Sequence, residues 1–332
     1  MKSRAAFYSF LLFGAFCSDF TSSTDDFSLE SKQSSGGRQT GRFRLARDVV
    51  LYNRIPKTGS TTFTNAVAYD LYRLNGFHAL HINTTKNNFL LNVVDQAEFV
   101  RNVSFWTAVR PAFYHGHLAF VDFNKFGFPN PLYINIVREP LERFVSYFYF
   151  LQHGDDYRVG LNRSRAGRNE TFDHCFKRRG RDCDPADKMW LQIPYFCGTS
   201  SFCKKPGSLE ALEAAKRNLV DHYLVEMIVV LERLLPDFFR GASSHFEELE
   251  SAEGECPFIR SSCGRKAHLR STTKKVDLQP ETLDRLKEHP IYRLEREFYD
   301  FAVQEFDSLA DRLKAADGTF LPRQFRYEKI KP

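Results

Sequence analysis

The segment Pro56-Lys57-Thr58-Gly59-Ser60-Thr61-Thr62 has residue types that suit the binding of phosphate or sulfate groups. It lies between the apolar run 49–54 and a helix-like stretch, so a tight turn and a helix N-terminus would expose several backbone N–H groups. Gly59 would let the backbone approach an anion closely, and Lys57 would add a mobile cation. The Walker A pattern is not met, because its first glycine is absent and the lysine precedes the glycine, which weakens a kinase or GTPase interpretation. An ordinary strand–turn–helix junction is the alternative.

Arg138 and Ser146 form a second candidate anion site. Arg138 follows the apolar run 132–137, and ligands of open parallel sheets bind at the carboxyl ends of strands. Pro140 suits the first turn of a helix, on which Ser146 lies about two turns further along. A guanidinium group and a hydroxyl suit a second phosphate. A surface arginine beside a helix serine is the alternative, and it would be preferred if the first loop were absent.

The stretch Tyr114-His115-Gly116-His117 could supply a general base. A histidine with a pKa near neutrality can take the proton of a hydroxyl group as that group attacks. Gly116 would keep the neighbouring backbone open to a bulky substrate. On a strand both histidines point to the same face, so a metal-binding pair is also geometrically feasible. Two structural histidines are the third interpretation.

Alternating strands and helices must position these residues, which predicts an α/β fold with a central parallel sheet flanked by helices. Strands are expected at 49–54, 78–83, 113–122 and 132–137. Helices are expected at 60–74, 140–151, 211–239, 281–286 and 292–313. The Ser-, Thr-, Asp- and Gly-rich stretch 21–45 reads as a flexible stem, and 46–332 as one folded domain.

The N-terminus and the overall charge indicate where the protein acts. Basic residues at 1–4 precede the apolar run 5–16, which is shorter than the roughly 20 residues that span a bilayer. The pattern within 1–20 therefore favours a secretory signal, with a short membrane anchor as the alternative. The net charge of +6 fits an acidic partner without choosing among nucleic acid, membrane and polyanionic sugar.

The cysteines and glycosylation sequons agree with a secretory protein. Apart from Cys17 in the apolar run, the cysteines form three close pairs: Cys175 with Cys183, Cys197 with Cys203, and Cys256 with Cys263. Their even number and spacing favour disulfides over zinc sites, whose ligands usually come as C-x₂₋₄-C. N-x-[ST] sequons begin at Asn83, Asn102, Asn162 and Asn169.

Longer stretches resemble one family of enzymes, from residue 49 to the C-terminus. They include YNRIPKTGSTTFTN, LHINTTKNN, FYHGHLAFVDFNKFG, YINIVREPLERFVSYFYFLQHGDDYR, KMWLQIPYFCG and HLRSTTKK. On these stretches the chain resembles the Golgi sulfotransferases, specifically the heparan sulfate 2-O-sulfotransferases. The resemblance implies a P-loop-like α/β fold, a type II topology in the Golgi membrane with a lumenal catalytic domain, and a homotrimer. The N-terminal apolar run would then be an anchor.

The resemblance also implies an activity. The sulfuryl group of 3′-phosphoadenosine 5′-phosphosulfate would pass, without a metal, to the 2-hydroxyl of a uronic acid, mainly iduronic acid, in heparan sulfate. The polyanionic partner would be this polysaccharide and not nucleic acid. The residues implied at the 5′-phosphosulfate are Lys57, Thr58, Gly59, Ser60 and Thr61. Those implied at the 3′-phosphate are Arg138, Ser146, Thr272 and Lys275.

The implied catalytic residues are His117 as general base, His115 as its supporting neighbour, and Lys57. The Lys57 ammonium would stabilise negative charge on the departing bridging oxygen. The residues implied at the acceptor polysaccharide are Arg54, Asn65, Tyr69, His81, Arg158, Arg163 and Arg270. For Arg163, which lies in a basic run, a solvated loop position is an equally good interpretation.

Two segments depart from the family pattern. The segment 219–236 is several residues shorter than the family pattern and lacks the V-G-x-T-E element that usually ends a core strand. Residues 243–266 are an additional insertion.

Three rival functions stay open at this point. They are a chondroitin/dermatan uronyl 2-O-sulfotransferase, whose loop lacks the P-K-T-x-S-T form, a kinase of the secretory pathway, and a non-catalytic heparin-binding protein.

The cysteine spacing yields a first testable prediction. We expect all three close pairs to be disulfide-bonded, because the chain enters an oxidising compartment. Each short loop constrains the unfolded chain only modestly, so each bond should add at most about 3 kcal/mol to the free energy of unfolding. Peptide mapping without reduction should recover each pair as a linked peptide. Recovery of the six cysteines as free thiols would contradict the prediction.

Overall fold

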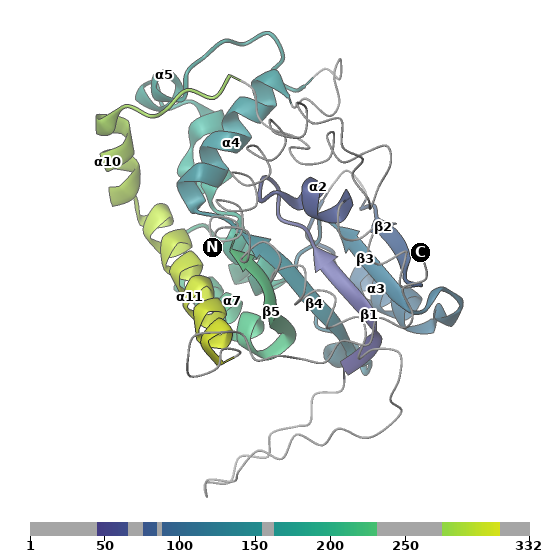
Figure 1. Cartoon of the computed structure of the whole chain (residues 1–332). Helices are drawn as coiled ribbons and strands as arrows, with labels where there is room; N and C mark the ends of the chain where they lie inside the picture. The colour runs from purple at the N-terminus through teal and green to yellow at the C-terminus, as the bar shows by residue number, and fades with distance from the viewer. Residues whose placement is uncertain (1–44, 66–75, 85–87, 155–162, 231–273, 313–332) are drawn as a thin grey trace, which may run out of the picture.

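A five-stranded sheet lies at the centre of the computed structural model, which describes residues 45–65, 76–84, 88–154, 163–230 and 274–312 (Figure 1). The strands stand in the order β2-β3-β1-β4-β5, and every neighbouring pair is parallel. Their bounds are β1 Leu45–Asn53, β2 His78–Ile82, β3 Ala112–Gly116, β4 Asn130–Val137 and β5 Tyr223–Val230. The predicted α/β fold with a parallel sheet is therefore confirmed.

The two strands beside β1 are buried along their whole length, on both faces. All eight residues of β4 and all five of β3 are buried, as expected for a parallel sheet that is covered on both sides. The edge strand β2 instead has only exposed and half-buried residues. Because parallel strands end at a common edge, the residues after β1, β3 and β4 lie close together.

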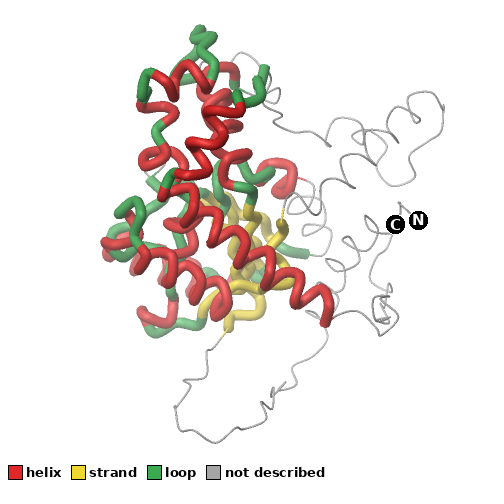
Figure 2. The backbone as a smooth tube through the Cα atoms, turned by 90° about the vertical axis from the view of Figure 1, so that its left-hand side faces the viewer, coloured by secondary structure: helices red, strands yellow, loops and turns green. Residues whose placement is uncertain are grey.

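Helices cover the sheet, and several of them lie in front of the strands when the molecule is viewed from the β5 side (Figure 2). Phe196 of α6 packs against Phe298 of α11, with ring centroids 4.9 Å apart. The α-helices are α2 Ser60–Phe63, α3 Val93–Phe105, α4 Pro140–His153, α5 Phe172–Lys177, α6 Gln192–Cys197, α7 Leu209–His222, α10 Pro280–Glu288 and α11 Pro290–Arg312.

Most predicted elements are present, but two predictions were wrong. The helix expected over 211–239 ends at His222, and the apolar run that follows forms the core strand β5. Short apolar runs rich in β-branched residues are ambiguous between helix and strand by periodicity alone. The strand expected over 113–122 ends at Gly116, opposite the end of β1. Helix α3 was not predicted, and the insertion 243–266 lies outside the described residues.

A buried polar cluster fixes the end of β1. Asn135 of β4 donates through Nδ2 to both Oδ1 and the carbonyl oxygen of Asn53, at 2.9 and 2.8 Å. Asn53 in turn donates to the hydroxyl of Tyr223, the first residue of β5, at 2.8 Å. Asn53 and Asn135 are fully buried, so these bonds satisfy groups that water cannot reach. The cluster joins three strands at the edge from which the candidate site is built.

Gly116 has a different role from the one its sequence context indicated. It is buried, and a Cβ at this position would lie 2.6 Å from the carbonyl oxygen and 2.7 Å from Cβ of Ile82, its neighbour in β2. A side chain would therefore separate β2 from β3. The expectation that Gly116 keeps the backbone open to a substrate was wrong, because glycine here allows two strands to approach each other.

Gly116→Ala should thus lower the free energy of unfolding by roughly 1–3 kcal/mol, the usual cost of overpacking. Chemical denaturation of the purified protein measures the loss. Gly127→Ala is the control, because its φ of 81° is left-handed but nothing lies within 4 Å of the added methyl. It should cost only about 1 kcal/mol, for the left-handed conformation of the alanine. Equal losses in the two variants would show that the contact with Ile82 is unimportant.

Candidate active site

The loop after β1 has the shape expected of an anion-binding turn. It leaves β1 at Asn53, and helix α2 begins at Ser60 with Gly59 as its N-cap. Lys57 and Gly59 are both left-handed, with φ of 68° and 73°. For lysine this conformation is uncommon and costs about 1 kcal/mol or more. The surrounding contacts must therefore hold the loop in this form.

The loop hydroxyls do not all face outward. The hydroxyl of Thr58 donates to the carbonyl of Ile55 at 3.0 Å, and its side chain is fully buried. The hydroxyl of Thr61 accepts a bond from Nη2 of Arg54 at 3.3 Å. Thr58 therefore shapes the turn with its side chain, which leaves its backbone N–H as the group that could meet an anion.

Arg138 joins the second candidate site to this loop. It follows β4, and its Nη1 donates to the carbonyl oxygen of Lys57 at 3.3 Å. Its Nη2 donates to Glu142 of α4 at 3.2 Å, and the ammonium of Lys275 lies 2.7 Å from the same carboxylate oxygen. Ser146 lies one turn further along α4 and is buried. The structure thus brings together residues that sequence analysis could only group by analogy.

Gln192, at the start of α6, holds the backbone of Arg138 from both sides. Its Oε1 accepts from the N–H of Arg138 at 3.0 Å, and its Nε2 donates to the Arg138 carbonyl at 2.9 Å. The side chain is completely buried. Glu295 of α11 fixes the same helix end, accepting from the N–H groups of three residues: Leu191, Gln192 and Ile193.

The buried carboxyl group of Glu295 has an altered acidity. Burial raises its pKa to about 7, although the nearby Arg143 guanidinium and the three N–H groups oppose this shift. Arg143 is also fully buried and donates to the carbonyls of Lys188 and Met189 at 2.8 and 2.9 Å. Buried polar side chains thus join α4 to residues 188–189 and α11 to the start of α6.

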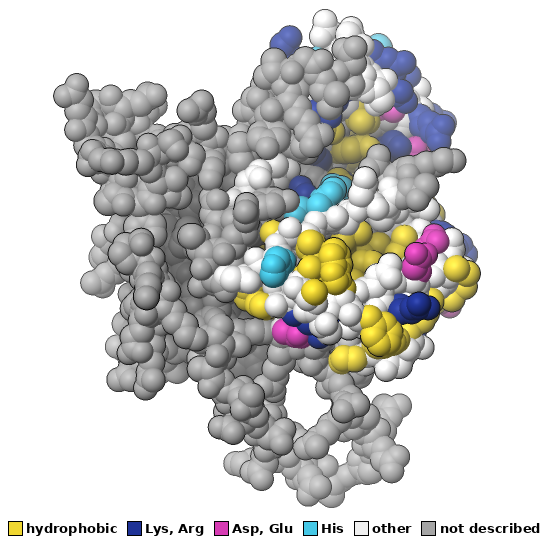
Figure 3. All heavy atoms as spheres, turned by 90° about the vertical axis from the view of Figure 1, so that its right-hand side faces the viewer, with side chains coloured by type: hydrophobic (Ala, Val, Ile, Leu, Met, Phe, Trp, Pro, Cys, Tyr) yellow, Lys and Arg dark blue, Asp and Glu magenta, His cyan; other side chains and the backbone are white. Residues whose placement is uncertain are grey.

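The two histidines lie at the end of β3, beside the start of the loop. Nδ1 of His117 lies 2.7 Å from the carbonyl oxygen of Arg54, and Nδ1 of His115 lies 3.5 Å from Arg54 Nη1. His81 of β2 packs near His115, with ring centroids 5.0 Å apart. Figure 3, which faces the β2 side of the sheet, shows histidine side chains at the surface there.

Arg54 gives the two imidazoles opposite tautomers. A carbonyl oxygen can only accept, so Nδ1 of His117 carries a proton, and in the neutral ring the lone pair is on Nε2. A guanidinium can only donate, so Nδ1 of His115 is an acceptor. Burial, followed by the positive charge of Arg54, lowers the pKa of His115 to about 3. His115 therefore stays neutral at any physiological pH.

Among the residues expected at the acceptor, Arg163 lies near the loop. Its guanidinium carbon lies 4.5 Å from the centre of the Phe150 ring, and Nζ of Lys57 lies 4.6 Å from the same ring. Asn65 is half-buried, in the turn that follows α2. Five expected site residues lie outside the described residues: Tyr69, Arg158, Asn162, Arg270 and Thr272.

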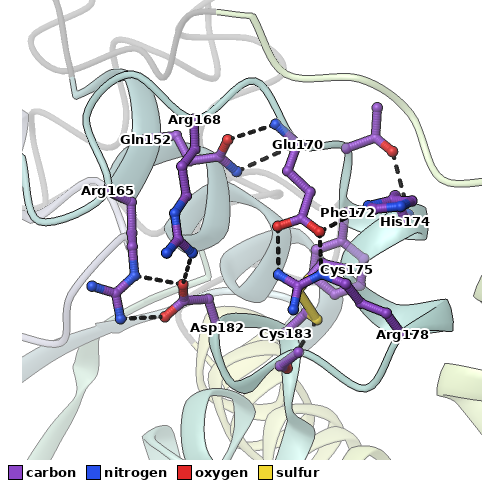
Figure 4. The surroundings of a disulfide bond; sticks show 12 residues. Gln152, Arg165, Arg168, Glu170, Phe172, His174, Cys175, Arg178, Asp182 and Cys183 are labelled. Atoms are coloured by element: carbon purple, nitrogen blue, oxygen red, sulfur yellow. Dashed lines mark hydrogen bonds and ion pairs between the residues drawn. A yellow bond between two sulfur atoms is a disulfide. The ribbon is translucent and has the colours of Figure 1, made fainter.

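Two of the three predicted disulfides, Cys175–Cys183 and Cys197–Cys203, are present. Cys256 and Cys263 lie outside the described residues. Around the first disulfide, two half-buried carboxylates form ion pairs: Glu170 with Arg178, and Asp182 with Arg165 and Arg168 (Figure 4). Glu170 also lies 2.9 Å from Nδ1 of His174. The sequon residues Asn83, Asn102 and Asn169 are exposed.

Within the described ranges, no helix has the length and apolar character that crossing a bilayer requires. Those ranges also bring no group of three His, Cys, Asp or Glu side chains to metal-binding distance.

A sequence profile of the sulfotransferase family matches residues 43–302. The chain belongs to the sulfotransferase family. It is 51% identical to heparan sulfate 2-O-sulfotransferase of Caenorhabditis elegans over 297 residues, which cover 86% of this chain and 87% of that protein. It is 47% identical to heparan sulfate 2-O-sulfotransferase 1 of Xenopus laevis and 46% identical to that of Homo sapiens, covering 86% and 90% of this chain and 78% and 82% of those proteins.

Sequence analysis missed several residues that shape the candidate site. Gln192, Glu142 and Phe150 carry no local signal, because amides, surface acids and aromatics are common in such positions. Arg143 does carry one: it is a charge on the apolar face of α4, between Leu141 and Phe144. A charge at such a position indicates a buried polar partner.

Removal of the two hydrogen bonds between Gln192 and the Arg138 backbone should weaken the candidate anion site. Gln192→Ala deletes two hydrogen bonds that hold Arg138, so adenosine 3′,5′-bisphosphate, expected at Arg138, should bind roughly 5- to 30-fold more weakly. Titration calorimetry measures this affinity, and thermal denaturation measures the accompanying loss of stability.

Gln152 provides a matched control, because it clamps the backbone of Glu170 in the same reciprocal way, at 3.1 and 3.0 Å, in the disulfide region. Gln152→Ala should lower the thermal midpoint without changing nucleotide affinity. If both variants lose affinity in proportion to their stability, Gln192 has no specific positioning role.

Proposed function

We propose that this sulfotransferase moves the sulfuryl group of 3′-phosphoadenosine 5′-phosphosulfate to the 2-hydroxyl of a uronic acid, mainly iduronic acid, in heparan sulfate. The observation that carries the proposal is the position of Arg54. Its guanidinium contacts His115 and Thr61 of the anion loop, and its carbonyl oxygen contacts His117. The proposed base and the proposed donor site therefore both adjoin Arg54. The names of the relatives supply the acceptor.

The proposed reaction is a single in-line displacement. As the acceptor oxygen attacks sulfur, its proton passes to Nε2 of His117, which the Arg54 carbonyl leaves with a lone pair. The bond from sulfur to the bridging oxygen breaks, and the negative charge develops on adenosine 3′,5′-bisphosphate. The Lys57 ammonium would stabilise this charge by leaving the Phe150 ring for the bridging oxygen.

His115 would orient the acceptor and Arg54, because a neutral imidazole with so low a pKa is too weak a base for this step. The 3′-phosphate would be held by Arg138, Ser146 and Lys275, with Thr272 outside the described residues. Arg54, His81 and Arg163 would face the polysaccharide.

Incubation with labelled donor and with desulfated heparan, chondroitin and dermatan acceptors, followed by disaccharide analysis, tests the proposal. Label in chondroitin or dermatan alone would overturn it.

We also propose a lumenal location in the Golgi apparatus, with a type II anchor in 1–20 and a homotrimeric assembly. The two disulfides and the exposed sequons support an oxidising, glycosylating compartment. Fractionation with protease protection tests the topology. Light scattering of the purified protein tests the trimer.

His117→Ala should lower turnover by about 10²-fold or more, because it removes the proton acceptor. The affinity for adenosine 3′,5′-bisphosphate should stay nearly unchanged, since the proposed role of His117 is toward the acceptor hydroxyl and its ring is held by the Arg54 carbonyl. Turnover, nucleotide affinity and thermal midpoint should be measured for His117→Ala and His115→Ala together. Normal turnover in His117→Ala with loss in His115→Ala would reverse the two roles, and activity in both would refute the site. A metal role would appear instead as sensitivity to chelators.

A further inference from the structure

Glu142 places a carboxylate between two cations that the proposed function assigns to the donor. One oxygen of this carboxylate, Oε2, lies 3.2 Å from Nη2 of Arg138 and 2.7 Å from Nζ of Lys275. Among the described residues, neither cation forms an ion pair with any other carboxylate. The proposed 3′-phosphate must therefore meet two cations that already share a negative partner.

The backbone of α4 fixes the position of this carboxylate. Glu139 caps the helix by accepting from the N–H of Glu142 at 2.8 Å, so Glu142 lies in the first turn. Ser146 lies four residues after Glu142 on α4, and helix residues at this spacing lie on the same face. Arg138 precedes the helix, and its Nη2 reaches the carboxylate from the end of β4. Glu142 therefore lies beside two of the groups proposed to hold the phosphate.

The Glu142 carboxylate is ionised, yet its ion pairs with Arg138 and Lys275 are exposed enough to separate. Although burial raises its pKa, the contacts with Lys275 and Arg138 outweigh this effect and lower it overall, so Glu142 is ionised at neutral pH. Its side chain is 50% exposed, and exposed ion pairs contribute little to stability. It can move into water when a dianion with three oxygens arrives.

We propose that Glu142 is an internal counter-ion that occupies the 3′-phosphate position until the donor binds. It competes with the phosphate for Arg138 and Lys275 and repels it, and thereby weakens the binding of the nucleotide. The proposal rests on the proposed donor site. Its consequence is fast release of adenosine 3′,5′-bisphosphate after transfer, at the expense of donor affinity.

Glu142→Gln tests the proposal, because it removes the charge and keeps the shape of the side chain. Adenosine 3′,5′-bisphosphate should bind about 3- to 10-fold more tightly, as expected for the loss of a competing, partly exposed charge. Adenosine 5′-phosphosulfate lacks the 3′-phosphate, so its affinity should not change. Both affinities can be measured by titration calorimetry on the full chain. Product inhibition by the bisphosphate should increase by the same factor.

Glu297→Gln is the matched control. Glu297 pairs with Lys216 at 2.7 Å and is 54% exposed, but it lies on α11 and contacts none of the proposed nucleotide groups. It should leave both affinities unchanged. Equal tightening in the two variants would show a general effect of net charge and overturn the proposal.

Unchanged or weaker binding of the bisphosphate by Glu142→Gln would also overturn it, as would equal tightening of the two nucleotides. Arg138→Ala separates this failure from failure of the donor site. If Arg138→Ala weakens the bisphosphate while Glu142→Gln does not tighten it, only the counter-ion role is wrong. If Arg138→Ala has no effect either, the donor site is misplaced and the proposal fails with it.

Discussion

The hydrogen bonds of Asn53 are the constraint on which the candidate site depends. Strand β1 ends at Asn53, whose side-chain and main-chain oxygens both accept a hydrogen bond from the Asn135 amide. The next residue, Arg54, leaves the sheet after donating its N–H to the carbonyl of Gly116 at 2.7 Å. The direction of the anion loop and the spacing of the histidines both follow from this exit point. The buried polar cluster thus fixes the point at which the chain leaves the sheet and the proposed anion loop begins.

Arg54 separates the properties of two histidines that sequence alone treats as equivalent. His115 is buried and faces a guanidinium, whereas His117 is half-buried and faces a carbonyl. Each contact selects one tautomer and one protonation behaviour. Two imidazoles that are two residues apart are thereby suited to different tasks. The assignment depends on partners brought by the parallel pairing of β1 and β3.

The sequence predicts the parts of the site whose residue types have few other uses. A lysine in a glycine-containing turn, an arginine at a strand end and a His-x-His pair all lie at the carboxyl edge of the sheet, as strand order requires. Gln192 and Glu142 could not be predicted, because their roles depend on contacts with Arg138 that only the folded chain creates. The strand β5 was missed because its apolar, β-branched run directly continues the pattern of helix α7.

The left-handed conformation of Lys57 shows where the chain accepts a local cost for chemistry. Glycine would adopt a φ of 68° without strain, as Gly59 does two residues later at 73°. Only lysine can bring an ammonium group to this turn. The bond from Arg138 to the Lys57 carbonyl helps to offset the strain, so the loop depends on a second strand for its shape. A peptide of the loop alone would therefore lack this geometry. An attempt to graft the motif onto another protein would have to transfer the neighbouring strand end as well.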